Sequence, residues 1–99
     1  MADKYRLKMA HSFKKDVKLC KKRGMPLDEL WNVIRTLLRG EKLGPEYKAH
    51  VLTGDRKGEC KCHIHPNWLL VWEQHDEELY LLMLNTGTHA DLFEKGKKR

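Results

Sequence analysis

The 99-residue sequence has few cysteines and no long apolar segment. Its three cysteines are an odd number, and no apolar run near the N-terminus precedes a small-residue cleavage site. A secreted disulfide framework is therefore not expected, and we predict free thiols in a reducing cytoplasm. No stretch approaches the roughly 20 apolar residues of a membrane-spanning helix. The sequence thus predicts no membrane partner.

The sequence also lacks the short motifs of many hydrolases and nucleotide-binding proteins. It contains no nucleophile elbow and no glycine-containing segment with the spacing of a P-loop. Hydrolysis through a serine or cysteine nucleophile is therefore poorly supported.

Negatively charged residues are in the minority. Twenty Lys and Arg residues stand against 14 Asp and Glu, which gives a formal charge of +6 and a pI of about 9.3. Clustered cations raise the local concentration of phosphates, so this balance favours an anionic partner. A basic surface that only confers solubility is the alternative. The length fits one domain, residues 1–99, with a single core.

The first forty residues predict a strand followed by a helical hairpin. Apolar and basic residues alternate over residues 5–9, as in a strand with one solvent-exposed face. Ser12 is the expected N-cap of a helix over residues 14–23, and Gly24 its stop. A second helix is expected from Pro26 to about residue 39. The core-facing stripes are Phe13, Val17 and Cys20 in the first helix and Leu27, Leu30, Trp31, Ile34, Leu37 and Leu38 in the second.

After Gly44 the apolar period changes from helical to strand spacing. Strands are expected over residues 47–52, 59–65, 68–72 and 79–84, then a terminal turn or short helix ending at Phe93 and a frayed basic tail over residues 95–99. The 68–72 strand is nearly continuous apolar sequence, as expected at the centre of a sheet. The predicted fold class is α+β, with the N-terminal strand and helical hairpin packed on a mostly antiparallel sheet of four to five strands.

Residues 60–65 first resemble a metal site, because Cys60, Cys62, His63 and His65 are zinc-ligand types. In a strand, however, successive side chains point to opposite faces. The two cysteines would then face the core with Ile64, while Lys61, His63 and His65 would face solvent. The four side chains could not close on one ion, so no metal or other cofactor is expected.

Three histidines, His50, His63 and His89, adjoin one face of the predicted sheet. Imidazole suits proton transfer at neutral pH, with a reference pKa of roughly 6.5. RNA cleavage without a metal needs a base for the ribose 2′-hydroxyl, an acid for the departing 5′-oxygen, and a cation near the phosphate. The histidines, with Lys or Arg, provide these groups. The pattern therefore predicts a ribonuclease site.

Other residues are candidates for RNA binding. The aromatic rings of Trp68 and Phe93 would stack on unpaired bases. Packing in the core is an equal alternative for Trp68, and a C-terminal plug is an equal alternative for Phe93. Lys61 lies in the same strand as His63, and Arg56 and Lys57 occupy the tip of a predicted hairpin. Lys14, Lys15 and Lys18 belong to a basic helix face that either follows phosphates or is simply solvated.

Four ordered blocks resemble the YafQ branch of the RelE-type toxins. They are FKKD at 13–16, LGPEYKAHVLTG at 43–54, CHIHPNWLL at 62–70 and GTHADLF at 87–93. The resemblance spans nearly the whole chain, from about Tyr5 to Phe93, and the ordered blocks make it highly specific.

The resemblance implies a RelE-like fold and an mRNA interferase of a bacterial type II toxin–antitoxin system. Such a toxin enters the ribosomal A site and cuts mRNA through 2′-hydroxyl attack without a metal. His89 would be the general acid, while His50 and His63 would act as base or orient the phosphate. The lysines of the first helix would rest on ribosomal RNA. Expected partners are a cognate antitoxin, the ribosome and mRNA, with operator DNA bound only through the antitoxin complex.

Asn67 departs from the family pattern, which has Pro-Asp-Trp where this chain has Pro66-Asn67-Trp68. An amide still forms hydrogen bonds but carries no charge and cannot act as a base. If the family carboxylate accepts a proton or raises a histidine pKa, cleavage by this chain should be slow. The alternative is a module that binds RNA, the ribosome or the antitoxin with little catalysis.

Overall fold

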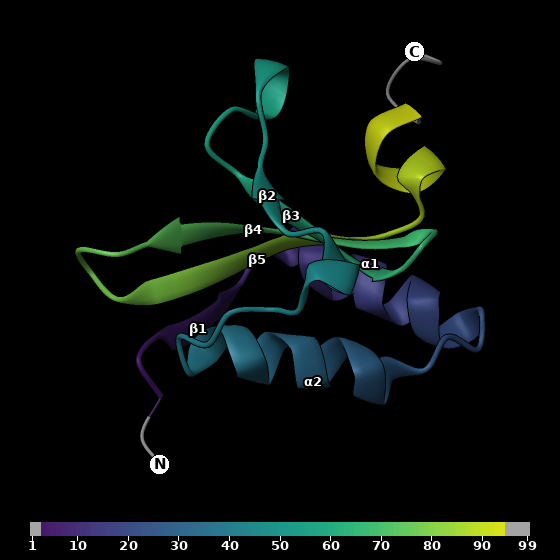
Figure 1. Ribbon diagram of the computed structural model, residues 1–99. Coiled ribbons are helices and arrows are strands. Elements are labelled where there is room, and N and C mark those ends of the chain that lie inside the picture. The colour runs from purple at the N-terminus through teal and green to yellow at the C-terminus, as the bar shows by residue number, and fades with distance from the viewer. Residues whose placement is uncertain (1–2, 95–99) are drawn as a thin grey trace.

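In the computed structural model, which describes residues 3–94, two helices cover one face of a five-stranded sheet (Figure 1). The strand order is β1-β5-β4-β3-β2, with β1 parallel to β5 and the other neighbours antiparallel. The elements are β1 (Arg6–Met9), α1 (His11–Lys22), α2 (Leu27–Leu38), η1 (Pro45–Tyr47), β2 (His50–Val51), η2 (Gly54–Arg56), β3 (Cys60–His65), β4 (Trp68–His75), β5 (Tyr80–Gly87) and η3 (Ala90–Glu94). The predicted α+β class is confirmed; the basic tail at 95–99 lies outside the described residues.

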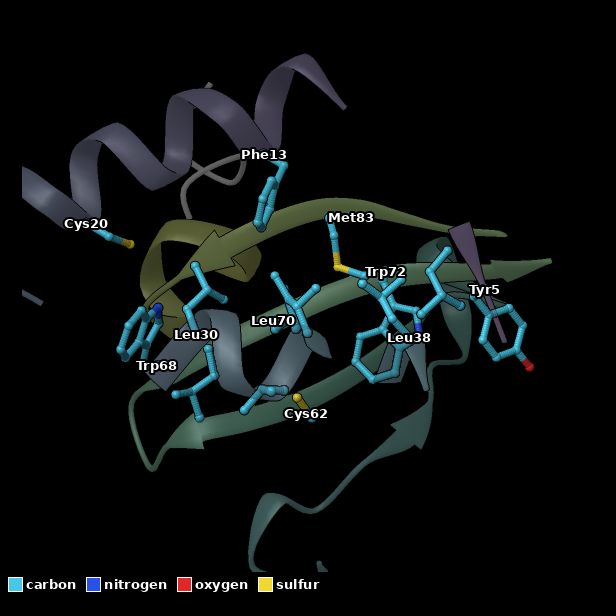
Figure 2. Close-up of a cluster of buried hydrophobic side chains, with 14 residues drawn as sticks. Tyr5, Phe13, Cys20, Leu30, Leu38, Cys62, Trp68, Leu70, Trp72 and Met83 are labelled. Carbon is cyan, nitrogen blue, oxygen red and sulfur yellow. The ribbon is translucent and has the colours of Figure 1, made fainter. Parts of the chain in front are cut away.

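The core lies between the helices and the sheet (Figure 2). Phe13 of α1 and Leu30 of α2 are completely buried, as are Leu70 of β4 and Met83 of β5. The Phe13 ring meets Trp31 edge-on, with 6.2 Å between ring centroids, so the two predicted helical stripes face each other as well as the sheet. Val33, outside the predicted stripe of α2, is also buried.

Strand β4 is the central strand, as its apolar sequence predicted. Leu70 and Trp72 pack toward the helices, whereas Leu69 and Val71 alternate with them and are also completely buried. A strand covered on both faces loses the alternation of polar and apolar residues. The continuous apolar run from Trp68 therefore follows directly from its position in the sheet.

Helix α1 begins at His11, and Ser12 is not its N-cap. The cap position is Ala10, which forms no side-chain capping bond. Ser12 instead donates to the carbonyl oxygen of Leu84 (2.8 Å), on the part of β5 that follows its pairing with β1. Polar side chains of α1 thus satisfy backbone groups on the edge of the sheet.

The segment between α2 and β3 is less regular than predicted. Residues 47–52 do not form one strand, since η1 ends at Tyr47 and β2 contains only His50 and Val51. Lys48 has a positive φ of 50°, which interrupts the extended backbone between them. The loop over residues 52–59 rises from the face of the sheet opposite the helices, as does η3 (Figure 1).

None of the helices in residues 3–94 is long and apolar enough to span a membrane.

Candidate active site

The candidate site lies on the face of the sheet that the helices leave uncovered. Strand β3 divides its side chains between the two faces: Cys62 and Ile64 are buried in the core, whereas Lys61 and His63 are half-buried on the opposite face. This confirms the strand parity predicted for these four residues.

The sheet register aligns the predicted residues along this open face. His50 pairs with Lys61 across β2 and β3. His63 pairs with Leu69, and Leu69 with Gly87, so these three residues form one row across β3, β4 and β5. Neighbouring strands are about 4.8 Å apart, which places β5 about 10 Å from β3. Because β5 leads into η3, the row brings the segment with His89 toward His63.

Phe93 is the contact point of several charged and aromatic groups. The Lys61 ammonium lies 5.3 Å from its ring centroid and the Arg56 guanidinium carbon 5.6 Å. The ring of His89 is 5.1 Å from that of Phe93, tilted by 37°. Side chains from η2 and β3 therefore meet those of the distant segment that contains His89 and η3 around one half-buried phenyl ring.

Arg56 is held in this cluster by hydrogen bonds as well. Its Nε donates to Glu59 (2.6 Å) and its Nη2 to Asn85 of β5 (2.6 Å). The guanidinium is thereby fixed between the η2 loop and the sheet. Lys57, the other cation predicted at this loop, is exposed to solvent.

His50 and His63 share a pattern of hydrogen bonding. Nδ1 of His50 lies 3.0 Å from the Lys48 carbonyl oxygen, and Nδ1 of His63 lies 3.2 Å from that of Pro66. A carbonyl oxygen only accepts, so each Nδ1 carries the proton. In the neutral ring Nε2 then holds the lone pair, which is the tautomer that a general base requires.

Two of the histidines border cavities that lie toward α2 and not on the open face. One of about 480 Å³ is lined by His63 together with Ile64 and Glu29 of α2, and one of about 560 Å³ is lined by His50 together with Trp72 and Leu37 of α2. Among the described residues, neither lining includes His89. The three histidines of the predicted site therefore do not share either of these cavities.

The turn with His89 is organised by a capping box that the sequence analysis missed. The backbone N–H of Asp91 donates to the Thr88 hydroxyl (3.1 Å), and that of Thr88 donates to Asp91 Oδ2 (3.0 Å). This is the reciprocal Thr-x-x-acid pattern of a helix N-terminus, and the spacing Thr88-x-x-Asp91 was its signal. The Arg23 guanidinium, together with these bonds, lowers the pKa of Asp91 to about 2.

Asn67 contacts this turn directly. Its Oδ1 accepts a long hydrogen bond of 3.5 Å from the backbone N–H of His89. The residue that departs from the family pattern thus lies beside the predicted acid.

Trp68 is the main correction to the predicted site. Its side chain is 2% exposed and belongs to the core, with Nε1 donating to the Thr86 hydroxyl (2.9 Å; Figure 2). Thr86 in turn donates to the Leu69 carbonyl oxygen (2.8 Å). The indole faces the helices and is not exposed for base stacking. The packing alternative holds for Trp68.

His65 also differs from expectation. The pairing register shifts between His63 and His65, so the two do not follow simple alternation. His65 Nε2 lies 2.6 Å from Glu29 of α2, and its ring stacks on Trp68 with 5.9 Å between centroids. His65 is therefore directed to the helix side and takes no part in the open face.

Lys14, Lys15 and Lys18 are exposed on α1. Because α1 covers the opposite side of the sheet, these lysines form a basic surface separate from the histidines (Figure 1). Within residues 3–94 no group of three or more His, Cys, Asp or Glu side chains is arranged to hold a metal ion.

Comparison with known proteins identifies the family. Residues 5–94 match the model for the bacterial toxin of type II toxin–antitoxin systems, YafQ. This chain belongs to that family. It is 37% identical over 82 residues to the mRNA interferase toxin YafQ of Escherichia coli K12, covering 82% of this chain and 87% of that protein. The predicted family is confirmed.

Solved structures of related toxins have the same fold. One is the E. coli DinJ–YafQ toxin–antitoxin complex, with a TM-score of 0.83 at 33% identity over 91% of this chain and 98% of that one. Another is a metal-bound toxin from Helicobacter pylori, with a TM-score of 0.84 at 34% identity over 90% of this chain and 99% of that one. Both confirm the RelE-like α+β fold predicted from the sequence.

Proposed function

We propose that this chain is an endoribonuclease, the toxin of a toxin–antitoxin pair, and that it cuts mRNA in the ribosomal A site. The observation that carries the proposal is the cluster in which Lys61, Arg56 and the His89 ring contact Phe93, on the face that also holds His63. Cations and imidazoles on an exposed surface suit a polyanionic substrate that is cleaved by proton transfer. The relative in E. coli is an mRNA interferase by name.

In the proposed reaction the bound RNA supplies its own nucleophile. Nε2 of His50 or His63 accepts the ribose 2′-hydroxyl proton, and the 2′-oxygen attacks the adjacent phosphorus. His89 donates a proton to the departing 5′-oxygen as the P–O5′ bond breaks. Lys61 and Arg56 stabilise the charge on the phosphate oxygens. The products are a 2′,3′-cyclic phosphate and a 5′-hydroxyl, and no cofactor enters these steps.

Phe93 and the remaining cations bind RNA in this proposal. Phe93 stacks on a base beside the cleaved phosphate, and Lys57 contacts the RNA backbone from the η2 loop. Lys14, Lys15 and Lys18 bind ribosomal RNA through the separate surface of α1. Two basic surfaces on opposite sides of the sheet suit a protein that contacts mRNA on one side and the ribosome on the other.

The partner proteins follow from the family. The E. coli toxin is seen in a complex with DinJ, and we extend this to a cognate antitoxin for the present chain. That antitoxin inhibits the toxin, and operator DNA is bound only through their complex.

Asn67 favours a second candidate, a toxin that binds RNA or ribosomes with little cleavage. The Asn67 amide contacts the His89 backbone but adds no negative charge beside the imidazole. An aspartate at this position would stabilise protonated His89 and so favour its role as acid.

The deciding experiment compares this chain with its Asn67→Asp variant in a ribosome-bound mRNA cleavage assay. We expect cyclic phosphate ends from both proteins and cleavage about threefold to tenfold faster with the aspartate. Equal rates would show that position 67 only forms a hydrogen bond. Growth arrest upon expression without any cut mRNA, from either protein, would favour the binding module.

A further inference from the structure

The turn with His89 is fastened to helix α1 by one ion pair. Arg23, directly after α1, donates from Nη1 to Asp91 Oδ2 at 2.7 Å and from Nη2 to Asp91 Oδ1 at 3.4 Å. The guanidinium therefore engages both carboxylate oxygens, the geometry that fixes orientation as well as distance. Because Arg23 and Asp91 are 68 positions apart in sequence, this contact joins two remote parts of the chain.

Asp91 transmits this contact to the backbone around His89. Its Oδ2 also accepts from the Thr88 N–H (3.0 Å), while its own N–H donates to the Thr88 hydroxyl (3.1 Å). His89 lies between these two residues, so the capping box closes around it. Gly87 precedes them with φ of +156°, and a Cβ at that position would lie 2.9 Å from Asp91 Oδ2. The side chain of Asp91 thus fills the space beside the end of β5.

Helix α1 holds the approach to the turn at a second point. The Asp16 carboxylate accepts from the Thr86 N–H (3.1 Å) and from the Asn85 side-chain amide (3.0 Å). Two α1-side groups, Asp16 and Arg23, therefore bind β5 and the following turn on either side of Gly87. The α1 helix is itself anchored in the core through Phe13 and Cys20.

We propose that Arg23 and Asp91 are positioning residues for RNA cleavage, which fix the backbone of residues 88–91 so that His89 and Phe93 lie over the open face. This inference rests on the proposed function. A general acid acts only within hydrogen-bond distance of the leaving oxygen, and a displacement of about 1 Å can lower a rate up to 100-fold. The pair bonds Thr88 and Asp91, on either side of His89, so we expect its effect to be exerted through the backbone of the turn.

Two other roles for Arg23 give different kinetics. As an RNA ligand on the basic helix, Arg23 would affect substrate binding, and Asp91 would not share the effect. As a purely stabilising ion pair, it would affect unfolding and leave catalysis unchanged below the unfolding temperature. Partly exposed ion pairs usually contribute little to stability.

The test measures kcat and KM for ribosome-bound mRNA cleavage with Arg23→Gln, Asp91→Asn and the double variant. Asparagine keeps an acceptor for the Thr88 N–H, so Asp91→Asn removes the ion pair while leaving the cap. We expect each single variant to lower kcat about fivefold to fiftyfold with KM within about twofold. The double variant should be no slower than the slower single one, because both remove the same contact.

Two further variants complete the set. Arg23→Lys keeps the charge but not the two-pronged geometry, so it should restore part of the lost kcat. Arg39→Gln breaks an exposed pair at the end of α2, where Arg39 Nε lies 3.2 Å from Glu41, and it should match the wild type. A raised KM in Arg23→Gln with a normal Asp91→Asn would overturn the inference in favour of RNA binding. Unchanged kcat with lowered unfolding temperature would overturn it in favour of stability alone.

NMR of the free protein separates this inference from the proposed function. Ring contacts between His89 and Phe93 should weaken, and the Thr88 and Asp91 amides exchange faster, in Arg23→Gln and Asp91→Asn but not in Arg39→Gln. If the wild type cuts no RNA while these changes occur, the proposed function fails and the coupling of α1 to the turn stands. Unchanged ring contacts in both variants would refute the positioning role whatever the activity.

Discussion

The two faces of the sheet are built by different kinds of contact. On the face under the helices, side chains such as Leu70 and Met83 are fixed by close packing. On the open face, Lys61 and Arg56 are placed by hydrogen bonds and ring contacts between segments far apart in sequence. The hydrophobic effect that stabilises the packed face is non-directional, whereas hydrogen bonds and ring contacts on the open face require specific distances and angles. Substitutions on the packed face should therefore reduce stability, and those on the open face should reduce activity.

His89→Ala should give the largest effect on activity with almost none on folding. Loss of the general acid is expected to lower mRNA cleavage about 100- to 10,000-fold. The exposed side chain predicts an unfolding temperature close to that of the wild type. A matched control is His65→Ala, which removes an exposed imidazole on the helix side and should retain the cleavage rate within about twofold. Similar losses in both variants would contradict the assignment of the open face.

Trp68→Ala should give the opposite result. The indole is 2% exposed and bonds Thr86, so its removal is expected to lower the free energy of unfolding by about 3–5 kcal/mol. Urea titration followed by circular dichroism measures the change. Phe93→Ala is the counterpart on the open face, and it should lose cleavage while keeping most of its stability. If Trp68→Ala stayed fully stable but failed to bind RNA, the stacking role rejected above would be restored.

The smallest predicted effect is on the stability of the protein at low pH, and it concerns the Asp91 carboxylate. The pKa of Asp91 is lowered from 3.8 to about 2, chiefly by the hydrogen bond from Arg23. Its contribution to stability is therefore present above pH 4 and is lost as the pH falls toward 2. Urea unfolding of wild type and Asp91→Asn between pH 2 and pH 6 should show their difference shrinking in that window. A difference that is constant with pH would refute the assigned cause.

The packed face was the part that residue patterns could predict. Helical spacing identified Phe13 and Leu30, and the uninterrupted apolar run identified β4. Both predictions succeeded because buried positions recur at regular intervals along a single helix or strand. Parity in β3 correctly separated Cys62 from His63. Local patterns could not give the helix start at His11, since Ser12 bonds a strand 72 positions away instead of its own helix.

Strand parity predicted that Lys61 and His63 share the open face, but the geometry around them was not predicted. Trp68 was predicted to stack on bases, yet a single strand position decides whether an aromatic ring stacks on a base or fills the core. The shift of register after His63 likewise moved His65 to the other side. Contacts of Phe93 with Arg56 and Lys61 depend on how distant segments fold back together, and no local spacing encodes that.

The parallel pairing of β1 with β5 has a consequence for how the protein is made. The first strand has its neighbour only after residues 80–83 have been synthesised, and His89 and Phe93 follow those residues. Pairing of such distant segments is slow and comes late in folding. A nascent chain that ends before β5 lacks both the strand that joins β1 to β4 and the proposed acid, so we expect no mRNA cleavage until β5 and the turn after it have been synthesised.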